Sequence, residues 1–262
     1  MTSTNGMQGR RAIVIGASSG FGARIAERFA EEGAKVVVAA RSLDKLEDVA
    51  GRIGATALAC DITVYEDVVR LAREAGEALG GLDVAVNSAG YEDMAFFRDL
   101  TPERIAPMVA VQFTGALYVI QQMAAAMTGG GSIVTISSLT ASLVAEGYAH
   151  YAGAKAGINH ASRIAASEYG AQGVRVNVVS PTLIETPMTK HLLAAPGVAD
   201  AFLQETPLGR IGRIDDVVSA VTWLASDASS FVTGQNLHVD GGTSLRRLPR
   251  VDDFLRAAKA GD

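Results

Sequence analysis

Two side chains near the middle of the sequence have the types and spacing needed to exchange a proton with a substrate. Tyr151 and Lys155 lie four residues apart in a segment whose pattern predicts a helix, and residues at that spacing share one helix face about 5–6 Å apart at Cβ. A phenol normally titrates near pH 10, and an ammonium beside it favours the phenolate. The pair therefore suggests that Tyr151 is a general acid or base near neutral pH.

A serine precedes this pair at the end of an apolar segment. Residues 132–137 predict a strand, which places Ser138 at its carboxyl end, the edge where open parallel sheets bind ligands. A tyrosine and a lysine four residues apart are common in helices by chance. Their assignment to catalysis therefore depends on the elements around them.

A glycine-rich turn lies between the first predicted strand, residues 10–15, and the first predicted helix, residues 21–32. Gly16, Gly20 and Gly22 follow a G-x-x-x-G-x-G pattern. Glycines let a backbone approach a ligand closely, and the N–H groups at a helix start favour an anion. A turn without a ligand is the alternative, because the spacing differs from G-x-G-x-x-G. Its position between strand and helix favours the pyrophosphate of a dinucleotide.

The second predicted strand ends in a cation. Ala40 is followed by Arg41 and Ser42, where an NAD-binding sheet would place an acid for the ribose 2′-hydroxyl. A guanidinium there can bind a 2′-phosphate, so NADP(H) is favoured over NAD(H), with a surface cation as the alternative. Asp61, after the third strand, either reaches the adenine or caps the next helix.

Strand and helix patterns alternate along the rest of the chain. The predicted strands are 10–15, 35–40, 56–60, 83–88, 132–137, 174–180 and 236–240, and the predicted helices include 43–53, 65–79, 101–127, 151–172, 188–204 and 215–226. Continuously apolar strands such as 36–40 indicate burial on both faces. We therefore expect an α/β fold: a doubly wound, Rossmann-like, seven-stranded parallel sheet in a single domain.

The composition narrows the class of protein. The 262 residues carry 23 basic and 28 acidic side chains, a net charge of −5, which argues against a nucleic-acid partner. The single cysteine, Cys60, excludes an intrachain disulfide, and no signal peptide or apolar run of about 18 residues is apparent. We expect a soluble, cytoplasmic protein without a membrane segment. The four histidines show no ligand spacing, so we predict no catalytic metal.

Several motifs in order resemble the short-chain dehydrogenase/reductase family over about residues 8–245, leaving 246–262 as a C-terminal tail. They are the glycine turn, Asn87-Ser-Ala-Gly90, Ser138, Tyr151-x-x-x-Lys155 and Asp240-Gly-Gly242. The resemblance implies that Lys155 binds the nicotinamide ribose and lowers the phenol pKa, that Tyr151 exchanges the proton, and that Ser138 holds the substrate oxygen. It also implies hydride exchange with a carbinol carbon and a homotetramer or dimer.

The turn, the second strand and the resemblance together predict a dinucleotide site. Its residues are Gly16, Ser18, Ser19, Gly20, Phe21, Gly22, Arg41, Ser42, Asp61, Ile62, Asn87, Ala89, Gly90, Lys155, Pro181, Ile184 and Thr186. By the resemblance, Ile184 and Thr186 contact the nicotinamide carboxamide.

Four positions depart from the family pattern. Ile15 and Ser88 replace a threonine and an asparagine, which puts a hydroxyl-to-backbone link between two turns in doubt. Gln112 stands where an asparagine completes the catalytic set, and the added methylene would shift a proton relay. Thr182 replaces a glycine and restricts the backbone.

The expected substrate is a small carbonyl compound or alcohol with a bulky, apolar body. Apolar residues in the loops after the middle strands are expected to contact it: Met94, Phe96, Phe97, Leu139, Leu143, Val144, Leu183, Met188, Leu192 and Leu193. The same residues would equally suit loops that only cover the hydrophobic core. Tyr148, three residues before Tyr151, either lines this site or lies on the surface.

Two other functions stay open beside an NADP(H)-dependent carbonyl reductase. One is a 3-oxoacyl thioester reductase, which a cationic patch near the site entrance would favour. The other is a dinucleotide-binding regulatory protein of weak activity, motivated by the four departures. The arginine-rich tail, with Arg246, Arg247, Arg250 and Arg256, is expected to be solvated or docked on a neighbouring subunit, with an anion site as the alternative.

Overall fold

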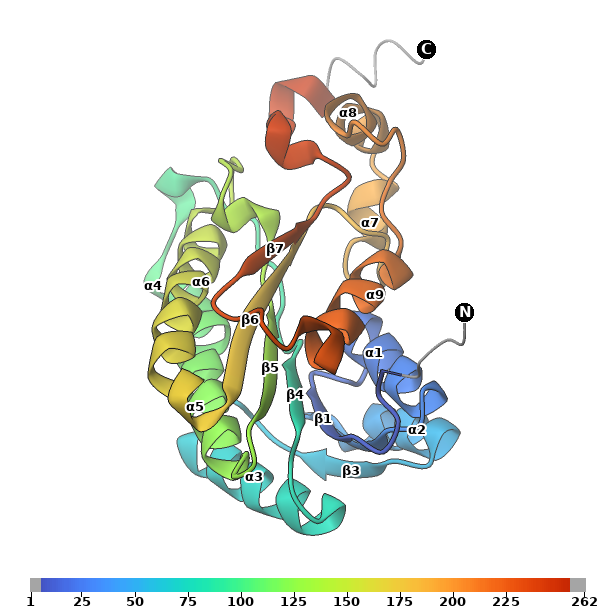
Figure 1. The fold of residues 1–262 in the computed structure, drawn as a ribbon. Coiled ribbons are helices and arrows are strands. Elements are labelled where there is room, and N and C mark those ends of the chain that lie inside the picture. Colours follow the sequence, from blue (N-terminus) through green and yellow to red (C-terminus); the bar gives the residue numbers. More distant parts are fainter. Residues whose placement is uncertain (1–5, 255–262) are drawn as a thin grey trace.

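Seven parallel strands form one sheet at the centre of the protein (Figure 1). The computed structural model describes residues 6–254. The strand order is β3-β2-β1-β4-β5-β6-β7, which confirms the predicted doubly wound α/β sheet. The bounds are β1 Arg11–Ile15, β2 Lys35–Ala40, β3 Thr56–Ala59, β4 Val84–Asn87, β5 Gly131–Ile136, β6 Val174–Pro181 and β7 Asn236–Val239.

Helices cover both faces of the sheet (Figure 1). One face carries α1 Gly20–Glu31, α2 Leu43–Ile53 and α9 Ile214–Ala225, and the other carries α3 Tyr65–Leu79, α4 Pro102–Val109, α5 Ala116–Ala126 and α6 Ala149–Tyr169. After Lys35, strand β2 is apolar because both of its faces are buried. Val36, Val38 and Ala40 pack in the core under α1, α2 and α9, whereas Val37 and Ala39 pack in the opposite core, because side chains alternate along a strand.

The strand order reverses between β1 and β4, which opens a crevice at their carboxyl ends. Strand β1 pairs with β2 on one side and with β4 on the other. The Gly16 turn and the Ser88–Gly90 turn therefore meet at this edge. The N–H of Ser88 donates to the carbonyl of Ile15 at 2.8 Å. A main-chain hydrogen bond therefore links the two turns, in place of the hydroxyl-to-backbone link that the residues at positions 15 and 88 had put in doubt.

The long apolar helix predicted for residues 101–127 is interrupted. A π-helical segment, Ala110–Gly115, separates α4 from α5, and π segments often occur at functional sites. Residues 102–126 are long and apolar enough to cross a membrane by length and composition, with 44% of the most apolar window buried. Met108, Val119 and Met123 are fully buried in the protein interior, and the core helix of a globular protein meets the same criteria.

The chain after β6 builds a cap above the crevice. The region predicted to be helical over 188–204 divides into α7 Lys190–Leu193 and α8 Val198–Glu205. Pro196 and Gly197 separate them, and Gly197 has a φ of 75° that favours glycine. Residues 246–254, drawn in red, lie beside α8 in Figure 1.

Candidate active site

The tyrosine and lysine of the predicted pair lie on one face of α6. The Lys155 Nζ is 5.8 Å from the centroid of the Tyr151 ring, and it donates a 2.7 Å hydrogen bond to the carbonyl of Ile136. Ile136 ends β5, two residues before Ser138. The lysine thus ties the helix bearing Tyr151 to the strand that positions Ser138.

Burial governs the protonation of this pair. It raises the pKa of Tyr151 to about 12, with a hydrogen bond from Ser138 acting in the opposite direction, and it lowers the pKa of Lys155 to about 7. The spacing had predicted a lowered phenol pKa. The shift is upward because Lys155 is turned to the Ile136 carbonyl and loss of solvent disfavours the phenolate. The phenol therefore keeps its proton at neutral pH.

Ser138 follows β5 directly and caps the short 3-10 turn Leu139–Ala141. Its Oγ accepts hydrogen bonds from the N–H and the hydroxyl of Thr140, at 3.2 and 3.0 Å. A hydroxyl that accepts in this way still has its own proton to donate. Ser138 can therefore donate to an oxygen atom beside Tyr151.

Gln112 lies in the π segment and is 2% exposed. Its Nε2 donates to the carbonyl of Tyr91 at 2.6 Å, and among the described residues its Oε1 has no hydrogen-bond partner. A Cβ on Gly90 would lie 2.9 Å from this amide, so a larger residue at position 90 would displace the Gln112 side chain. Ser138, Tyr151, Lys155 and Gln112 all line the same pocket, and the structure brings the four predicted catalytic residues together.

A cavity of about 510 Å³ adjoins this pocket along the carboxyl ends of β1 to β4. The predicted residues that line it are Gly16, Ser18, Ser19, Gly20, Phe21, Arg41, Ser42, Asp61, Ile62, Ala89, Gly90 and Thr186. Gly16 has a φ of 80°, and a Cβ there would lie 2.5 Å from the amide nitrogen of Ala89. This close backbone cradle at the start of α1 fits a dinucleotide pyrophosphate.

Five predicted cofactor residues lie elsewhere. Gly22 packs against the Gly16 turn, and Asn87 is buried, with its Oδ1 accepting from the N–H of Ala89 at 3.2 Å. Both support the turns from beneath. Lys155, Pro181 and Ile184 line the neighbouring pocket instead.

The two charged positions predicted at the adenosine end both line the cavity. Arg41 is exposed there, and no hydrogen bond or ion pair within residues 6–254 involves it. The Oδ1 of Asp61 accepts from the N–H and hydroxyl of Thr63 at 2.9 and 2.7 Å. Asp61 thus holds the turn that leads to α3 while lining the cavity. It is not the predicted helix cap, because the N-cap of α3 is Val64, and its contact with the adenine stays a prediction.

Sequence reasoning missed several lining residues. Tyr91, Val111, Pro187 and Met188 also contact the cofactor cavity. Tyr91 directly follows the Asn87–Gly90 motif, which was the one available signal. The others lie in segments whose place at the sheet edge depends on the fold.

The pocket beside the catalytic residues holds about 200 Å³. Five of the predicted apolar contacts line it, namely Met94, Leu139, Leu183, Met188 and Leu192, whereas Phe96, Phe97, Leu143, Val144 and Leu193 do not. Phe97 and Val144 are 81% and 88% exposed. The predicted apolar wall is therefore present, and half of the residues predicted for it line the pocket.

Residues 248–254 of the C-terminal segment complete the pocket, which contradicts the predicted solvated tail for this part of the chain. Leu248, Pro249, Val251 and Phe254 line the pocket of their own chain. Phe254 stacks on Phe202 of α8 with centroids 6.2 Å apart, and the Arg250 Nε donates to Glu146 at 3.0 Å. Apolar residues between the arginines drive this docking. Arg256 lies outside the described residues.

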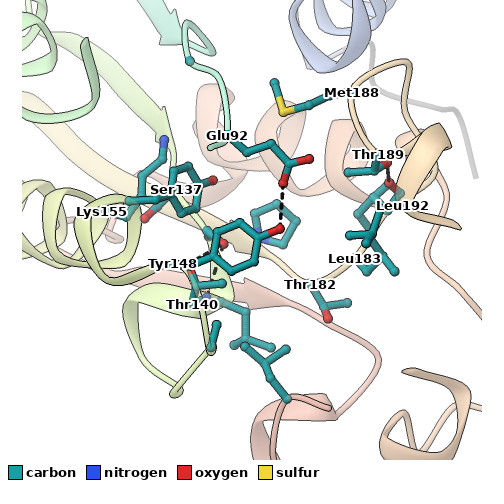
Figure 2. A pocket seen from close by; sticks show the side chains of 18 of the residues that line it. Glu92, Ser137, Thr140, Tyr148, Lys155, Thr182, Leu183, Met188, Thr189 and Leu192 are labelled. Atoms are coloured by element: carbon teal, nitrogen blue, oxygen red, sulfur yellow. Dashed lines mark hydrogen bonds between the residues drawn. The ribbon is translucent and has the colours of Figure 1, made fainter. Parts of the chain in front are cut away.

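Two polar side chains interrupt the apolar wall. The Tyr148 hydroxyl lies 3.3 Å from the Oε2 of Glu92, and Figure 2 shows both groups within the pocket, with Met188, Leu183 and Leu192 around them. Burial raises the pKa values of both groups. Tyr148 lines the site, as one of its two predicted alternatives had it, whereas Glu92 was missed.

No group of three or more His, Cys, Asp or Glu residues within the described part of the chain is arranged to hold a metal. His150, next to Tyr151, is turned away from the pocket wall and hydrogen bonds to the Oδ2 of Asp93 at 3.2 Å. Its contact is with the loop after β4.

Comparison with known proteins identifies the class that this fold and site define. Residues 16–244 match the family described as Enoyl-(Acyl carrier protein) reductase. An uncharacterised oxidoreductase of Mycobacterium bovis is 38% identical, covering 90% of this chain and 97% of its own length. A structure of a short-chain type dehydrogenase/reductase from Mycobacterium ulcerans has a TM-score of 0.90 at 33% identity and covers 92% of both chains.

Relatives with named activities show comparable similarity. Glucose 1-dehydrogenase of Gluconobacter oxydans is 35% identical, over 90% of this chain and 92% of the relative. D-threitol dehydrogenase of Mycolicibacterium smegmatis is 31% identical, over 92% and 95%. The chain belongs to the short-chain dehydrogenase/reductase family. It is an oxidoreductase of alcohols and ketones, and its family uses nicotinamide dinucleotides.

Proposed function

We propose that the protein is an NADP(H)-dependent carbonyl reductase or alcohol dehydrogenase that interconverts a ketone and a secondary alcohol on a bulky, largely apolar substrate. The observation that supports this most is the convergence of Ser138, Tyr151 and Lys155 on a mostly apolar pocket that opens beside the cofactor cavity. We further propose a cytoplasmic homo-oligomer, a tetramer or dimer, which the family resemblance suggests.

The residues divide the chemistry among them. The nicotinamide dinucleotide, when bound, supplies or accepts the hydride. The Ser138 hydroxyl donates to the carbonyl oxygen and orients it, and Tyr151 protonates that oxygen because its raised pKa keeps the phenol neutral. The Oε1 of Gln112 has no hydrogen-bond partner among the described residues and can accept a hydrogen bond from a water molecule. Such a water would return to Tyr151 the proton that the phenol gives to the substrate. The apolar walls exclude other water from the reacting atoms.

Arg41 supports NADP(H) over NAD(H). It is exposed at the rim of the cavity next to Ser42 and is free of ion pairs within the described chain. A guanidinium in that position is available for a charge-assisted, two-pronged bond to a 2′-phosphate. No carboxylate follows β2 directly to bind a ribose 2′-hydroxyl instead.

The named relatives favour the same reaction class. Their names specify glucose, D-threitol and 2,5-dichloro-2,5-cyclohexadiene-1,4-diol as compounds that they dehydrogenate. Each of these compounds carries hydroxyl groups on saturated carbons. Alcohol oxidation or its reverse is therefore the proposed reaction here.

A 3-oxoacyl thioester reductase is the second candidate, motivated by the acyl-carrier name of the matched family. It would need free cations at the pocket entrance to hold a carrier phosphate. Arg247 pairs with Glu205 at 2.9 Å, and Arg250 pairs with Glu146 at 3.0 Å. Because local carboxylates already engage these cations, we favour a small ketone. The intact catalytic residues likewise argue against a purely regulatory protein.

The proposal is tested by following NADPH and NADH absorbance against ketones, diketones, quinones and acyl thioesters. Replacing Tyr151 by Phe should lower kcat by about 10²- to 10⁴-fold, since the general acid is lost, and should leave NADPH affinity nearly unchanged. Tyr65→Phe is the matched control, because the Tyr65 hydroxyl meets Gln122 outside the pocket. Unchanged turnover in Tyr151→Phe would refute the acid assignment.

A further inference from the structure

Two carboxyl groups line the substrate pocket, and neither takes part in the proposed reaction. Glu146 pairs with Arg250, which leaves Glu92 without a task. Glu92 lines the pocket from the loop after β4, and its side chain is 20% exposed. Neither proton transfer nor the predicted cofactor contacts involve it. A carboxyl on a mostly apolar wall is costly unless a donor satisfies it, so its presence calls for an explanation.

Glu92 lies close to the reacting atoms. Its Oε2 is 3.3 Å from the Tyr148 hydroxyl, and the Tyr148 ring lies edge-on to the Tyr151 ring with centroids 6.0 Å apart. Figure 2 shows the Tyr148 hydroxyl pointing toward the Glu92 carboxyl. A group bound at Glu92 therefore lies in the same pocket as Tyr151, with the Tyr148 ring beside both residues.

The loop that carries Glu92 is held from both sides. The amide of Gln112 binds the carbonyl of Tyr91 at 2.6 Å, just before Glu92. Asp93, just after it, binds Arg104 at 2.8 Å and the buried ring of His150 at 3.2 Å. These anchors direct the Asp93 carboxylate away from the pocket and hold the Glu92 carboxylate toward it.

Within residues 6–254, the partners of Glu92 leave part of its hydrogen-bonding capacity unused. The bond from Tyr148 is long, at 3.3 Å, and the Nε2 of His191 lies 3.8 Å from Oε1, beyond hydrogen-bond distance. A carboxylate accepts about four hydrogen bonds. Room therefore remains for a donor that arrives with the substrate.

We propose that Glu92, oriented by Tyr148, binds a second hydroxyl of the substrate, so that the pocket selects a hydroxyketone, or the corresponding diol, over a ketone with one oxygen. This inference rests on the proposed carbonyl–alcohol chemistry. Glu92 accepts from the hydroxyl, and Tyr148 is a positioning residue that orients the carboxyl. A hydroxyl suits the site better than an ammonium does, because a hydroxyl has one proton to donate, whereas an ammonium has three to satisfy against a mostly apolar wall.

Selectivity is measured as the ratio of kcat/KM for 2-hydroxycyclohexanone to that for cyclohexanone, with NADPH. The wild-type ratio should exceed about 10. Glu92→Leu should lower it by about 10- to 100-fold, the loss of a hydrogen bond to a charged group, mainly through KM of the hydroxyketone. Glu92→Gln, which retains an acceptor, should recover part of it, and Tyr148→Phe should lower it by about 3- to 10-fold. Asp99→Asn is the matched control, because Asp99 is an exposed carboxylate of the same loop region.

A binding measurement separates this inference from the proposed reaction. Calorimetric titration of Tyr151→Phe, loaded with NADP⁺, should show tighter binding of cyclohexane-1,2-diol than of cyclohexanol, and adding Glu92→Leu should abolish the difference. Binding that follows this pattern without wild-type turnover would refute the proposed function and support the inference. A turnover ratio or a binding difference that Glu92→Leu leaves unchanged would overturn the inference. Tighter binding of 2-aminocyclohexanol than of the diol would overturn the choice of a hydroxyl.

Discussion

The cofactor cavity and the substrate pocket share one edge of the sheet but are built in different ways. The cavity is formed largely by the main chain of short turns after β1 to β4, and the contact of Gly16 with Ala89 shows how close these turns lie. The pocket is formed by side chains from segments as distant as Glu92 and Phe254. The cavity is thus built mainly from turns within the first third of the chain, whereas the pocket draws on segments from the whole chain.

This difference has a functional consequence. Backbone N–H groups can bind a phosphate whatever the neighbouring side chains are. The cofactor cavity should therefore tolerate many side-chain substitutions but few that change the path of the main chain. Side chains on loops set the shape and polarity of the substrate pocket, and loops accept substitution readily. Substitutions in these loops can therefore change which substrate the enzyme accepts without changing the hydride-transfer chemistry. Four substitutions test this contrast.

Gly16→Ala should have the largest effect. A Cβ at residue 16 would meet the Ala89 backbone at 2.5 Å, and the φ of 80° is strained for alanine. We expect NADPH affinity to fall more than about 100-fold and stability to fall by about 1–3 kcal/mol, measured by fluorescence titration and urea unfolding. Gly51→Ala in α2 is the control, because a Cβ there meets nothing within 4 Å. Equal behaviour of the two variants would show that the turns are not a tight cradle.

Arg41→Ala should affect one cofactor alone. Loss of a charge-assisted bond corresponds to about 10- to 100-fold weaker NADPH binding, while NADH binding should change little. Titration of both cofactors into the variant measures the difference. Arg52→Ala serves as control, because Arg52 pairs with Glu27 on the outer surface of the helices. Equal losses for NADPH and NADH would remove Arg41 from the phosphate site.

Phe254→Ala should affect the substrate pocket and spare the cavity. The ring stacks on Phe202 and closes the pocket, and an aromatic pair is worth about 0.5–1.5 kcal/mol. We expect KM for a bulky ketone to rise about 3- to 10-fold with NADPH affinity unchanged. Phe231→Ala is the control, because Phe231 is fully exposed. An unchanged KM would mean that the C-terminal segment leaves the pocket during turnover.

Gln112→Asn should have the smallest effect, within about threefold in kcat, or a slight gain. The amide is retained and only one methylene is removed, so a proton relay through it can re-form. Comparison with Gln112→Leu, which removes the amide, measures what the group contributes. Complete loss of turnover in Gln112→Asn would show that the relay depends on the longer side chain and its bond to the Tyr91 carbonyl.

Much of the fold was predictable because its causes are local. The apolar strands, the helical spacing between them and the Gly16 turn each depend on residues close in sequence, and the strand bounds differ from prediction by about one residue. The convergence of Ser138, Tyr151 and Lys155 also followed, since strand ends and helix starts meet at one sheet edge. Family membership follows from the same motifs.

The tertiary structure alone decided the features that depend on burial and on distant contacts. The upward shift of the Tyr151 pKa arises from desolvation, which a spacing of four residues does not encode. Glu92 lines the pocket because its neighbours in sequence anchor the loop that carries it. The C-terminal segment lines the pocket because Phe254 stacks on Phe202. The sequence by itself therefore determined the sheet, the Gly16 turn and the meeting of Ser138, Tyr151 and Lys155 at one edge, whereas long-range packing determined the pKa of Tyr151 and the shape of the pocket.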